Sequence, residues 1–238
     1  MKIILPMAGN GQRFFDDGYD LPKPLIDVKG VPMFKRVLDN IAGDADNDVV
    51  AIVRADHIRD YSIDKKLQEA HPGIEIVWTD GPTEGAACTV MLGIDKHSDE
   101  DVLIANCDQI ALFDVDTFND ICITHDGTIL TFTSNDPEPK HSYVTVDAEG
   151  HLIELAEKKK ISNEATVGVY HFGSQREFSI AVDKMIQAND RVNNEFYLAP
   201  AYNYYDGKVT TFAASKMYGM GTPQELEKFK QTDYYEAL

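Results

Sequence analysis

The chain has 238 residues, of which 43% are hydrophobic and 26% charged, a mix typical of a globular protein with a substantial core. Its net charge of −18 argues against nucleic acid or an anionic membrane as a partner. No apolar stretch approaches the roughly 20 residues of a transmembrane helix, and residues 1–7 lack the apolar core of a signal peptide, so we expect a cytoplasmic protein.

The first half of the chain alternates short apolar runs with helical patterns. These patterns predict strands over 2–7, 48–54, 74–78 and 101–106, and helices near 32–42, 57–70 and 85–96. Such alternation predicts an α/β fold, a Rossmann-like three-layer sandwich whose central sheet is mainly parallel with helices on both faces.

Beyond residue 125 the pattern changes to strands with little helix between them. We expect strands over 127–134, 142–147, 151–156, 165–172 and 208–215, with helices over 174–188 and from about 223. Thr222 suits the cap of the last helix and Pro223 its first position. The central sheet should therefore be mixed, with an antiparallel extension.

The loop after the first predicted strand carries a phosphate-binding pattern. Gly9 and Gly11 free backbone N–H groups that can surround an anion, and Arg13 can grip phosphate oxygens with two hydrogen bonds. Lys23 follows, with a stiffening proline on each side. No GxxxxGKS/T loop is present, and Phe14 stands where the dinucleotide fingerprint needs glycine or alanine. A surface turn with solvated cations is the alternative.

The fourth predicted strand, within "VLIANCDQI", ends in Asn106, Cys107 and Asp108. Ligands of open α/β sheets bind at the carboxyl ends of the strands. A carboxylate in that position, facing phosphates, is a natural ligand of Mg²⁺. The three cysteines of the chain show no metal-binding spacing and are expected to be reduced, buried thiols.

Together, "LPMAGNGQRF" and "LPKPLIDVKGVPM" resemble the signature of the nucleotidylyltransferase family, which makes NDP-sugars from sugar 1-phosphates. The matching segments are Leu5–Arg13, Pro22–Leu25 and Gly30–Met33. The resemblance implies a nucleotide-diphospho-sugar transferase fold of the glycosyltransferase-A type. It also implies that Ala8 joins the two glycines of the loop in binding the nucleotide, and that the arginine and lysine of the signature are catalytic.

Three further segments resemble parts of the same family. "TDGPTEGAACTV" is similar to its base-binding turn, which implies nucleotide contacts from Thr83, Gly85 and Ala86; an ordinary helix start capped by Thr83 is the alternative. "ELAEKKKISNEATVGVYHF" and the later Asn-Glu pair are similar to its acceptor-binding segments. The residues that this places at the acceptor are Glu157 at its hydroxyls, Lys158 at its phosphate, Gly168 and Glu195.

Two departures from the family pattern concern the metal. The resemblance maps Asp108 onto the metal-binding aspartate, with Mg²⁺ as the cofactor. Gly219, however, takes the place of the second metal-binding aspartate, and Pro200 follows Ala199 where another aspartate is usual. Either one carboxylate holds the metal with more water or phosphate ligands, or a residue such as Glu195 substitutes, or catalysis is weakened or altered.

The resemblance spans nearly the whole chain and is strongest to a branch found with bacterial surface-polysaccharide genes. It implies one domain over 1–238, with a nucleotide-binding half over 1–125 and an acceptor-binding half over 126–238. The substrates would be an NTP and a sugar 1-phosphate or similar phosphate monoester, with no nucleic acid or membrane involved. A homodimer is one expectation for the oligomeric state, which the sequence leaves open.

Other functions are compatible with parts of this pattern. A glycosyltransferase that uses an NDP-sugar has a similar fold, but it typically needs an Asp-x-Asp pair, and here the strand ends in Asp108-Gln109-Ile110. A cytidylyltransferase that acts on a non-sugar phosphate is another alternative. Gly219 motivates a third, a sensor of nucleotide or sugar phosphate without catalytic activity. The sequence does not identify the NTP or the acceptor.

Overall fold

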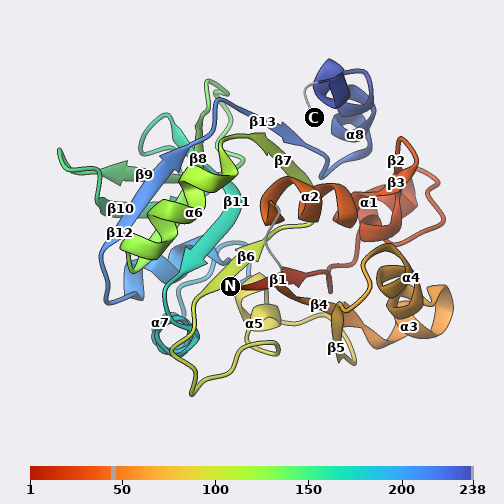
Figure 1. Cartoon of the computed structure of the whole chain (residues 1–238), viewed down its shortest axis with the longest axis horizontal. Coiled ribbons are helices and arrows are strands. Elements are labelled where there is room, and N and C mark those ends of the chain that lie inside the picture. Colours follow the sequence, from red (N-terminus) through yellow and green to blue (C-terminus); the bar gives the residue numbers. More distant parts are fainter. Residues whose placement is uncertain (44–46, 237–238) are drawn as a thin grey trace.

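The computed structural model describes residues 1–43 and 47–236. Within these residues a nine-stranded sheet has the order β10-β9-β11-β6-β1-β4-β5, with β8 beside β11 and β12 beside β8 (Figure 1). Its strands are β1 (Lys2–Pro6), β4 (Asp48–Arg54), β5 (Glu75–Thr79), β6 (Val102–Ala105), β8 (Gly127–Thr133), β9 (Ser142–Val146), β10 (Leu152–Glu157), β11 (Glu164–Phe172) and β12 (Val209–Ala213). Two small ladders pair β2 (Asp27–Val28) with β3 (Val31–Pro32), and β7 (Gln109–Leu112) with β13 (Lys216–Gly219).

Eight α-helices and three short 3₁₀ helices belong to the described part of the chain. The α-helices are α1 (Gln12–Asp16), α2 (Met33–Ala42), α3 (Ala55–Tyr61), α4 (Ile63–Ala70), α5 (Ala86–Val90), α6 (Val115–Thr124), α7 (Gln175–Gln187) and α8 (Pro223–Lys230). The 3₁₀ helices are η1 (Lys23–Leu25), η2 (Ala199–Tyr204) and η3 (Asp233–Glu236). Among these residues no helix is both long enough and apolar enough to span a bilayer.

The sheet is mixed, as the sequence predicts. β1 pairs in parallel with β4 and with β6, and β4 pairs in parallel with β5. β11 then runs antiparallel to β6, β8 and β9, and so joins the parallel strands to the later ones. The loops that follow β1, β4, β5 and β6 consequently meet at one edge of the sheet.

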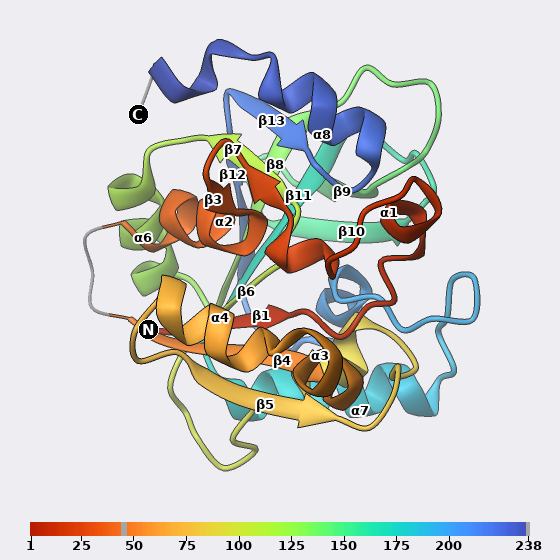
Figure 2. The ribbon, with the colours of Figure 1, turned by 90° about the vertical axis from the view of Figure 1, so that its right-hand side faces the viewer.

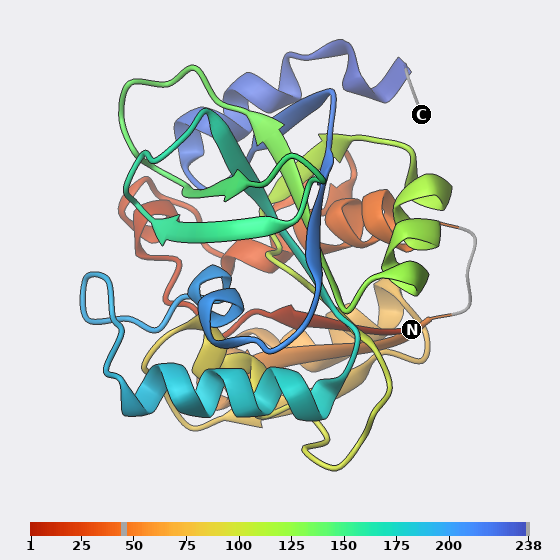
Figure 3. The same cartoon turned by 90° about the vertical axis from the view of Figure 1, so that its left-hand side faces the viewer.

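Successive side chains along the central strands point to opposite faces of the sheet and so form a layered core. Ile3 and Leu5 of β1 pack in a buried cluster with residues of α2, α4 and α6, whereas Ile4 packs on the other side with residues of α5 and α7. Figure 3 shows α7, in cyan, lying along one face of the sheet. The chain therefore has the predicted three layers, with helices on both faces of the sheet.

A third buried cluster attaches the C-terminal helix to the N-terminal segment. Phe14 of α1 and Ile26 after η1 pack with Leu226 and Phe229 of α8. Figure 2 shows α8, in blue, above the β7–β13 ladder and close to α2. As predicted, α8 begins at Pro223, capped by the side chain of the preceding threonine. This packing holds the first and last segments of the chain together at the site described below.

Several elements differ from the prediction. The helix expected over 57–70 is broken at Ser62, whose φ of 51° is left-handed and separates α3 from α4. The helix expected over 85–96 ends at Val90, where the chain turns so that Gly93 approaches Ile52 of β4. The prediction also missed α6, whose cap Asp114 accepts a hydrogen bond from a backbone N–H, and the short β7–β13 ladder.

Candidate active site

The carboxyl ends of β1 and β6 bring two charged side chains into contact. Lys23, the first residue of η1, donates a hydrogen bond from Nζ to Oδ2 of Asp108 at 2.8 Å. Their side chains are 26% and 16% exposed, so the ion pair is partly exposed and does not lie in the core. The adjacent parallel strands β1 and β6 place the two loops at the same edge.

The charge of Lys23 is stabilised by this pairing. Burial lowers the pKa of the Lys23 ammonium, but the Asp108 carboxylate outweighs that effect, and the pKa rises above its ordinary value. Arg13 is also close enough for its charge to lower the pKa of Lys23. Lys23 is therefore protonated at neutral pH, and two neighbouring cations form a place that favours an anion.

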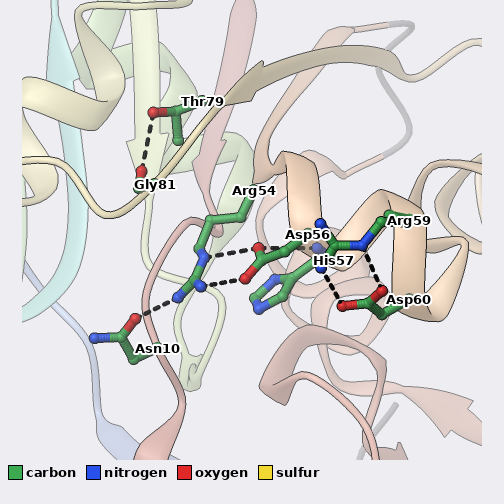
Figure 4. Close-up of polar contacts among 8 residues, drawn as sticks. All are labelled: Asn10, Arg54, Asp56, His57, Arg59, Asp60, Thr79 and Gly81. Carbon is green, nitrogen blue, oxygen red and sulfur yellow. Dashed lines mark hydrogen bonds and ion pairs between the residues drawn. The ribbon is translucent and has the colours of Figure 1, made fainter.

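Arg54, which no sequence motif marked, ties the glycine loop to the neighbouring strand. It is the last residue of β4 and donates to both carboxylate oxygens of Asp56 and to the side-chain oxygen of Asn10 (Figure 4). The hydrogen bond from Arg54 lowers the pKa of the Asp56 carboxyl. Next in the loop, Gly11 has a φ of 61°, a left-handed conformation that favours glycine. The sequence did contain a signal for this contact, namely an arginine at the end of a buried strand and two residues before an aspartate.

A cavity of about 220 Å³ lies between the glycine loop and the turn before α5. Its lining includes five of the six predicted nucleotide-binding residues, Ala8, Gly9, Thr83, Gly85 and Ala86. The sixth, Gly11, packs beside Lys23 instead. The structure thus places the two predicted nucleotide segments, which are distant in sequence, on opposite sides of one cavity.

The turn before α5 has little freedom to vary. Gly85 has a φ of 140°, and a Cβ there would come within 3.0 Å of the backbone of Phe196. Phe196 N donates to Glu84 O at 2.8 Å, and its carbonyl accepts from Ala87 N at 3.1 Å. Thr83 Oγ1 donates to the Gly85 carbonyl at 2.8 Å, and α5 has no side-chain cap. The alternative in which Thr83 caps an ordinary helix is therefore wrong.

A larger cavity of about 310 Å³ is shared by both halves of the chain. Arg13 and Asp108 reach it from the first half, and Glu157, Lys158 and Gly168 from the second. It meets the smaller cavity at Ala86, which lines both. The predicted catalytic, metal-binding and acceptor-binding positions therefore lie around a single space beside the predicted nucleotide pocket, except for Lys23 and Glu195. Lys23 does not line this cavity but contacts Asp108, which does.

Glu157, the last residue of β10, has an altered acidity. Burial raises the pKa of its carboxyl, while a hydrogen bond donated by Ser142 Oγ and the charge of Lys158 lower it. The net effect is a raised pKa. A half-buried carboxylate of this kind accepts hydrogen bonds readily, because solvent compensates its charge only in part.

Lys158 is held in a backbone conformation that is unusual for a residue with a side chain. Its φ of 51° is left-handed, and its N donates to His141 O at 2.9 Å. The ammonium donates a hydrogen bond to the hydroxyl of Tyr197 and lies 4.3 Å from the centre of that ring. Lys158 is therefore aimed into the larger cavity by its own backbone and by a tyrosine.

Gly168 forms part of the floor of the larger cavity. Its φ is 95°, and it lies where the pairing of β11 with β8 is irregular. A Cβ there would come within 3.0 Å of the side chains of Gln109 and Asn106, which are hydrogen-bonded to each other at 3.2 Å. Glycine at this position thus lets two amide side chains, one from the residue after β6 and one from the first residue of β7, cover the strand.

Glu195 lies apart from the other predicted acceptor-binding residues. It lines the smaller cavity, beside the turn before α5, and does not line the larger one with Glu157. The reason is local: Asn193 and Asn194 both have positive φ, so the chain makes a tight turn in which Glu195 pairs with Val192. Its charge still raises the pKa of Glu157, so the two carboxylates remain electrostatically coupled.

Polar residues that the sequence analysis did not identify complete the larger cavity. They come from the ends of strands, from β11 and from the loops before β9 and η2, and include Asn106, Gln109, His141, Ser142, Tyr170 and Tyr197. Asn106 and Gln109 flank the predicted metal ligand in sequence, which was a usable signal. The histidine and serine become visible only once β9 is paired with β10 beside Glu157.

The residues present can be tested against the implied Mg²⁺. In the part of the chain that the structure describes, no group of three or more histidine, cysteine, aspartate or glutamate side chains could hold a metal. Mg²⁺ sites that act on nucleotides commonly use only one or two carboxylates, completed by phosphate and water. A Cβ on Gly221 would lie 3.0 Å from Oδ2 of Asp108, so this glycine keeps space beside that carboxylate. The donor chemistry therefore fits Mg²⁺ held jointly with substrate.

The cysteines offer no nucleophile at this site. All three are unpaired; Cys107 and Cys122 are buried, as predicted, whereas Cys88 is half-buried. Burial raises the pKa of Cys107 to about 11 and that of Cys122 to about 12. Burial raises the pKa of Cys88 as well. All three thiols are therefore protonated at neutral pH, and a thiolate is the form that attacks.

Two curated relatives match most of this chain but only part of their own length. The bifunctional protein GlmU of Methanocaldococcus jannaschii is 26% identical over 175 residues, which cover 72% of this chain and 40% of that protein. The bifunctional protein GlmU of Methanococcus aeolicus is 28% identical over 179 residues, with the same two coverages. The chain thus spans about two fifths of the length of these relatives.

Solved structures share the fold over nearly the whole chain. The nucleoside-diphosphate-sugar pyrophosphorylase of Vibrio cholerae RC9 superposes with a TM-score of 0.83 at 23% identity, covering 97% of this chain and 100% of that one. A UDP-glucose pyrophosphorylase complexed with UDP-glucose superposes with a TM-score of 0.74 at 16% identity, covering 100% and 99%. These likenesses confirm the predicted fold class.

The family itself is identified by a match along the sequence. The family model described as nucleotidyl transferase matches residues 1–230, almost the entire chain. This match includes the glycine loop, the strand end at Asp108 and the segment around Lys158, and it agrees with the family that the motifs resemble. The chain belongs to the nucleotidyl transferase family.

Proposed function

We propose that this protein transfers a nucleotidyl group from an NTP to a sugar 1-phosphate, giving an NDP-sugar and pyrophosphate. The observation that carries the proposal is the larger cavity, where Arg13 and Asp108 from one half face Glu157 and Lys158 from the other. Family membership supports nucleotidyl transfer. The sugar-nucleotide activities named for the relatives of Vibrio cholerae and for the UDP-glucose enzyme support a sugar phosphate as the acceptor.

The reaction forms and breaks one bond at phosphorus. An oxygen of the acceptor phosphate bonds to the α-phosphorus of the NTP, and the bond from that phosphorus to the bridging oxygen breaks. Its electron pair leaves with pyrophosphate. Both reactants are anions, so the protein must hold them together and compensate their charge, and no covalent intermediate is needed. The protonated, buried thiols are consistent with this scheme.

On the nucleotide side, the backbone N–H groups between Gly9 and Gly11, together with Arg13, would bind the departing pyrophosphate. Lys23 would bind the α-phosphate, exchanging its present partner Asp108 for a phosphate oxygen. Asp108 would then hold Mg²⁺ against the phosphates, and the bound cation supplies charge compensation there. We therefore propose that the reaction depends on Mg²⁺.

On the acceptor side, Lys158 would bind the phosphate of the sugar and align its oxygen for attack. Glu157 would accept hydrogen bonds from sugar hydroxyls, and Gly168 would let the side chains of Asn106 and Gln109 lie against β11, where their amides can face the sugar. The lining of this cavity is mostly polar, with amide, hydroxyl and imidazole groups beside the charged residues. Such a lining suits a polyhydroxylated ligand more than an apolar one.

The experiment that tests the function measures pyrophosphate release. Purified protein with Mg²⁺ is supplied with each of CTP, UTP, GTP, ATP and dTTP, alone and together with a panel of sugar 1-phosphates and with phosphocholine. We expect pyrophosphate only when an NTP and one sugar 1-phosphate are both present, and no release without Mg²⁺.

The alternatives give different products in the same assay. A cytidylyltransferase for non-sugar phosphates would release pyrophosphate with CTP and phosphocholine. A glycosyltransferase would release NDP from an NDP-sugar and no pyrophosphate from any NTP. A sensor would bind nucleotide without forming product. Each of these results would overturn the proposed activity and would identify which alternative replaces it.

We further propose that the NDP-sugar is used for surface-polysaccharide or glycoconjugate synthesis, and that the enzyme works in the cytoplasm, where NTPs are made. The sequence resemblance to a branch found with surface-polysaccharide genes supports this role. A single domain divided at about residue 125 into nucleotide-binding and acceptor-binding halves, and assembly as a homodimer, are part of the same proposal. Light scattering of the purified chain would test the homodimer.

A further inference from the structure

The segment before α8 is fixed against the predicted metal ligand. Met220 N donates a hydrogen bond to Asp108 O at 2.7 Å. A Cβ built on Gly221 would lie 3.0 Å from Oδ2 of Asp108 and 3.5 Å from Oε2 of Glu225. Two carboxylates, one from the end of β6 and one from the first turn of α8, therefore border the same space left by a glycine.

The Glu225 carboxylate also lies beside Gly219. A Cβ on Gly219 would be 3.4 Å from the carboxyl carbon of Glu225 and 3.5 Å from each of its oxygens. Glu225 is the third residue of α8, and its backbone N donates to Thr222 Oγ1 at 3.2 Å. The helix cap thus fixes a carboxylate where a side chain at position 219 would begin.

Lys23 compensates only one of these two carboxylates. Its Nζ contacts Oδ2 of Asp108, whereas no hydrogen bond or ion pair to the Glu225 side chain is formed by residues 1–43 and 47–236. His141 lines the larger cavity, and burial lowers the pKa of its imidazole. The charge of Glu225 is near enough to raise that pKa in part. The Glu225 carboxylate is therefore exposed, unpaired and close to the active site.

We propose that Glu225 is a second protein ligand, beside Asp108, of the divalent cation at the active site. The distances of 3.0 Å and 3.5 Å to the Gly221 position add to 6.5 Å, so the two carboxylate oxygens lie no farther apart than that. Rotation of the exposed Glu225 side chain can shorten this gap to the roughly 3 to 4 Å between two oxygens that share one Mg²⁺. The inference rests on the proposed function for the presence of the cation.

The test measures Mn²⁺ binding to the full chain by the electron paramagnetic resonance signal of the free ion, so it needs no turnover. Mn²⁺ is titrated alone and again with pyrophosphate, the expected product. Glu225→Gln should weaken binding at least about tenfold, since loss of even an indirect partner of a metal costs 10- to 100-fold. Glu225→Asp should recover part of that loss. Glutamine also suits the third position of a capped helix, so α8 should stay intact.

Glu227→Gln is the matched control, because it removes the same charge from the same helix at a residue that contacts Lys230 and Tyr19 instead. It should bind Mn²⁺ as the unmodified chain does. The proposal is overturned if the Mn²⁺ binding curves of Glu225→Gln and of the unmodified chain coincide in both titrations. This includes the case in which neither protein binds Mn²⁺. A loss in Glu225→Gln without pyrophosphate release in any substrate panel would keep the ligand assignment and reject only the proposed reaction.

Discussion

The two lysines of the proposed mechanism, Lys23 and Lys158, lie in opposite surroundings. Lys23 donates to the carboxylate of Asp108 and begins a short helix between two prolines. Lys158 donates to the neutral hydroxyl of Tyr197 and has a left-handed backbone. One lysine is therefore paired with an anion before any substrate binds, while the other is only positioned.

This contrast indicates two different ways to prepare a phosphate site. A phosphate that reaches Lys23 must replace Asp108, which releases that carboxylate for a cation, so binding of nucleotide and of metal should be coupled. A phosphate that reaches Lys158 replaces only a phenol hydrogen bond, and no charge has to be displaced. In the proposed function the first site takes the NTP and the second takes the sugar phosphate.

The largest expected effect comes from breaking the first pair. Lys23→Ala should lower kcat by about 10² to 10³, as loss of one electrostatic donor to a transition state does. The fold should be retained, because the Lys23 side chain is a quarter exposed. Steady-state kinetics with the NTP and sugar phosphate identified above, together with thermal unfolding, measure both quantities.

Lys65→Ala, on the exposed side of α4, removes a charge of the same sign away from the site and should leave kcat unchanged. Unchanged turnover in Lys23→Ala would show that this lysine has no part in the mechanism. Its contact with Asp108 would then be an ion pair without a catalytic role.

Much of this architecture follows from short-range patterns. The buried strands and the three layers were predictable because apolar runs such as Ile3–Leu5 serve both faces of a parallel sheet. The glycine loop, Lys23 and Asp108 were predictable because they follow strands whose ends meet. The break at Ser62 was not, since it depends on turning Ile63 of α4 into the core formed with β1 and β4.

The proposed acceptor side of the larger cavity was predicted less completely, for a physical reason. Its groups come from β9, β10, β11 and a tight turn. They meet only once these strands are paired in the order and register of the folded sheet, which brings Ser142 opposite Glu157. Glu195 illustrates the difficulty, because two asparagines with positive φ direct it to the smaller cavity. Glu225 was missed because its carboxylate borders the space beside Asp108 only where the glycines at 219 and 221 have no side chain. That arrangement is seen only in the folded chain.

The second prediction concerns Lys158, the lysine proposed to bind the sugar phosphate. Lys158→Ala should raise the KM of the sugar phosphate about 10- to 100-fold, the effect of losing one hydrogen bond to a charged group, and should leave the KM of the NTP unchanged. The comparison is clean because alanine also has a Cβ, so the cost of the left-handed backbone is the same.

Tyr197→Phe removes only the hydroxyl that positions the ammonium and should have a smaller effect on the same KM. A rise in the KM of the NTP in Lys158→Ala, or a fall in kcat as large as that in Lys23→Ala, would show that the two lysines do not serve separate substrates.

The smallest expected effect concerns Glu157, next to Lys158. Burial raises the pKa of this carboxyl, so the folded chain holds its proton more tightly than the unfolded chain. Its contribution to the free energy of unfolding is therefore present below the ordinary carboxyl pKa and is lost as the pH rises through the raised value. Glu157→Gln, which cannot ionise, should gain in Tm relative to the unmodified chain over that range, by no more than about 4 °C, the shift that 1 kcal/mol produces at this size.

Calorimetry across the acidic to neutral range measures this difference, and Ser142→Ala supplies the control. The hydrogen bond from Ser142 lowers the pKa of Glu157, so its removal should raise that pKa further and move the loss of stability to higher pH. Profiles of Tm against pH that run parallel for the unmodified chain and Glu157→Gln would mean that Glu157 titrates as an ordinary exposed carboxyl. The Glu157 carboxylate beside Lys158 would then be fully solvated. The difference between the two lysines would depend only on the ion pair of Lys23 with Asp108.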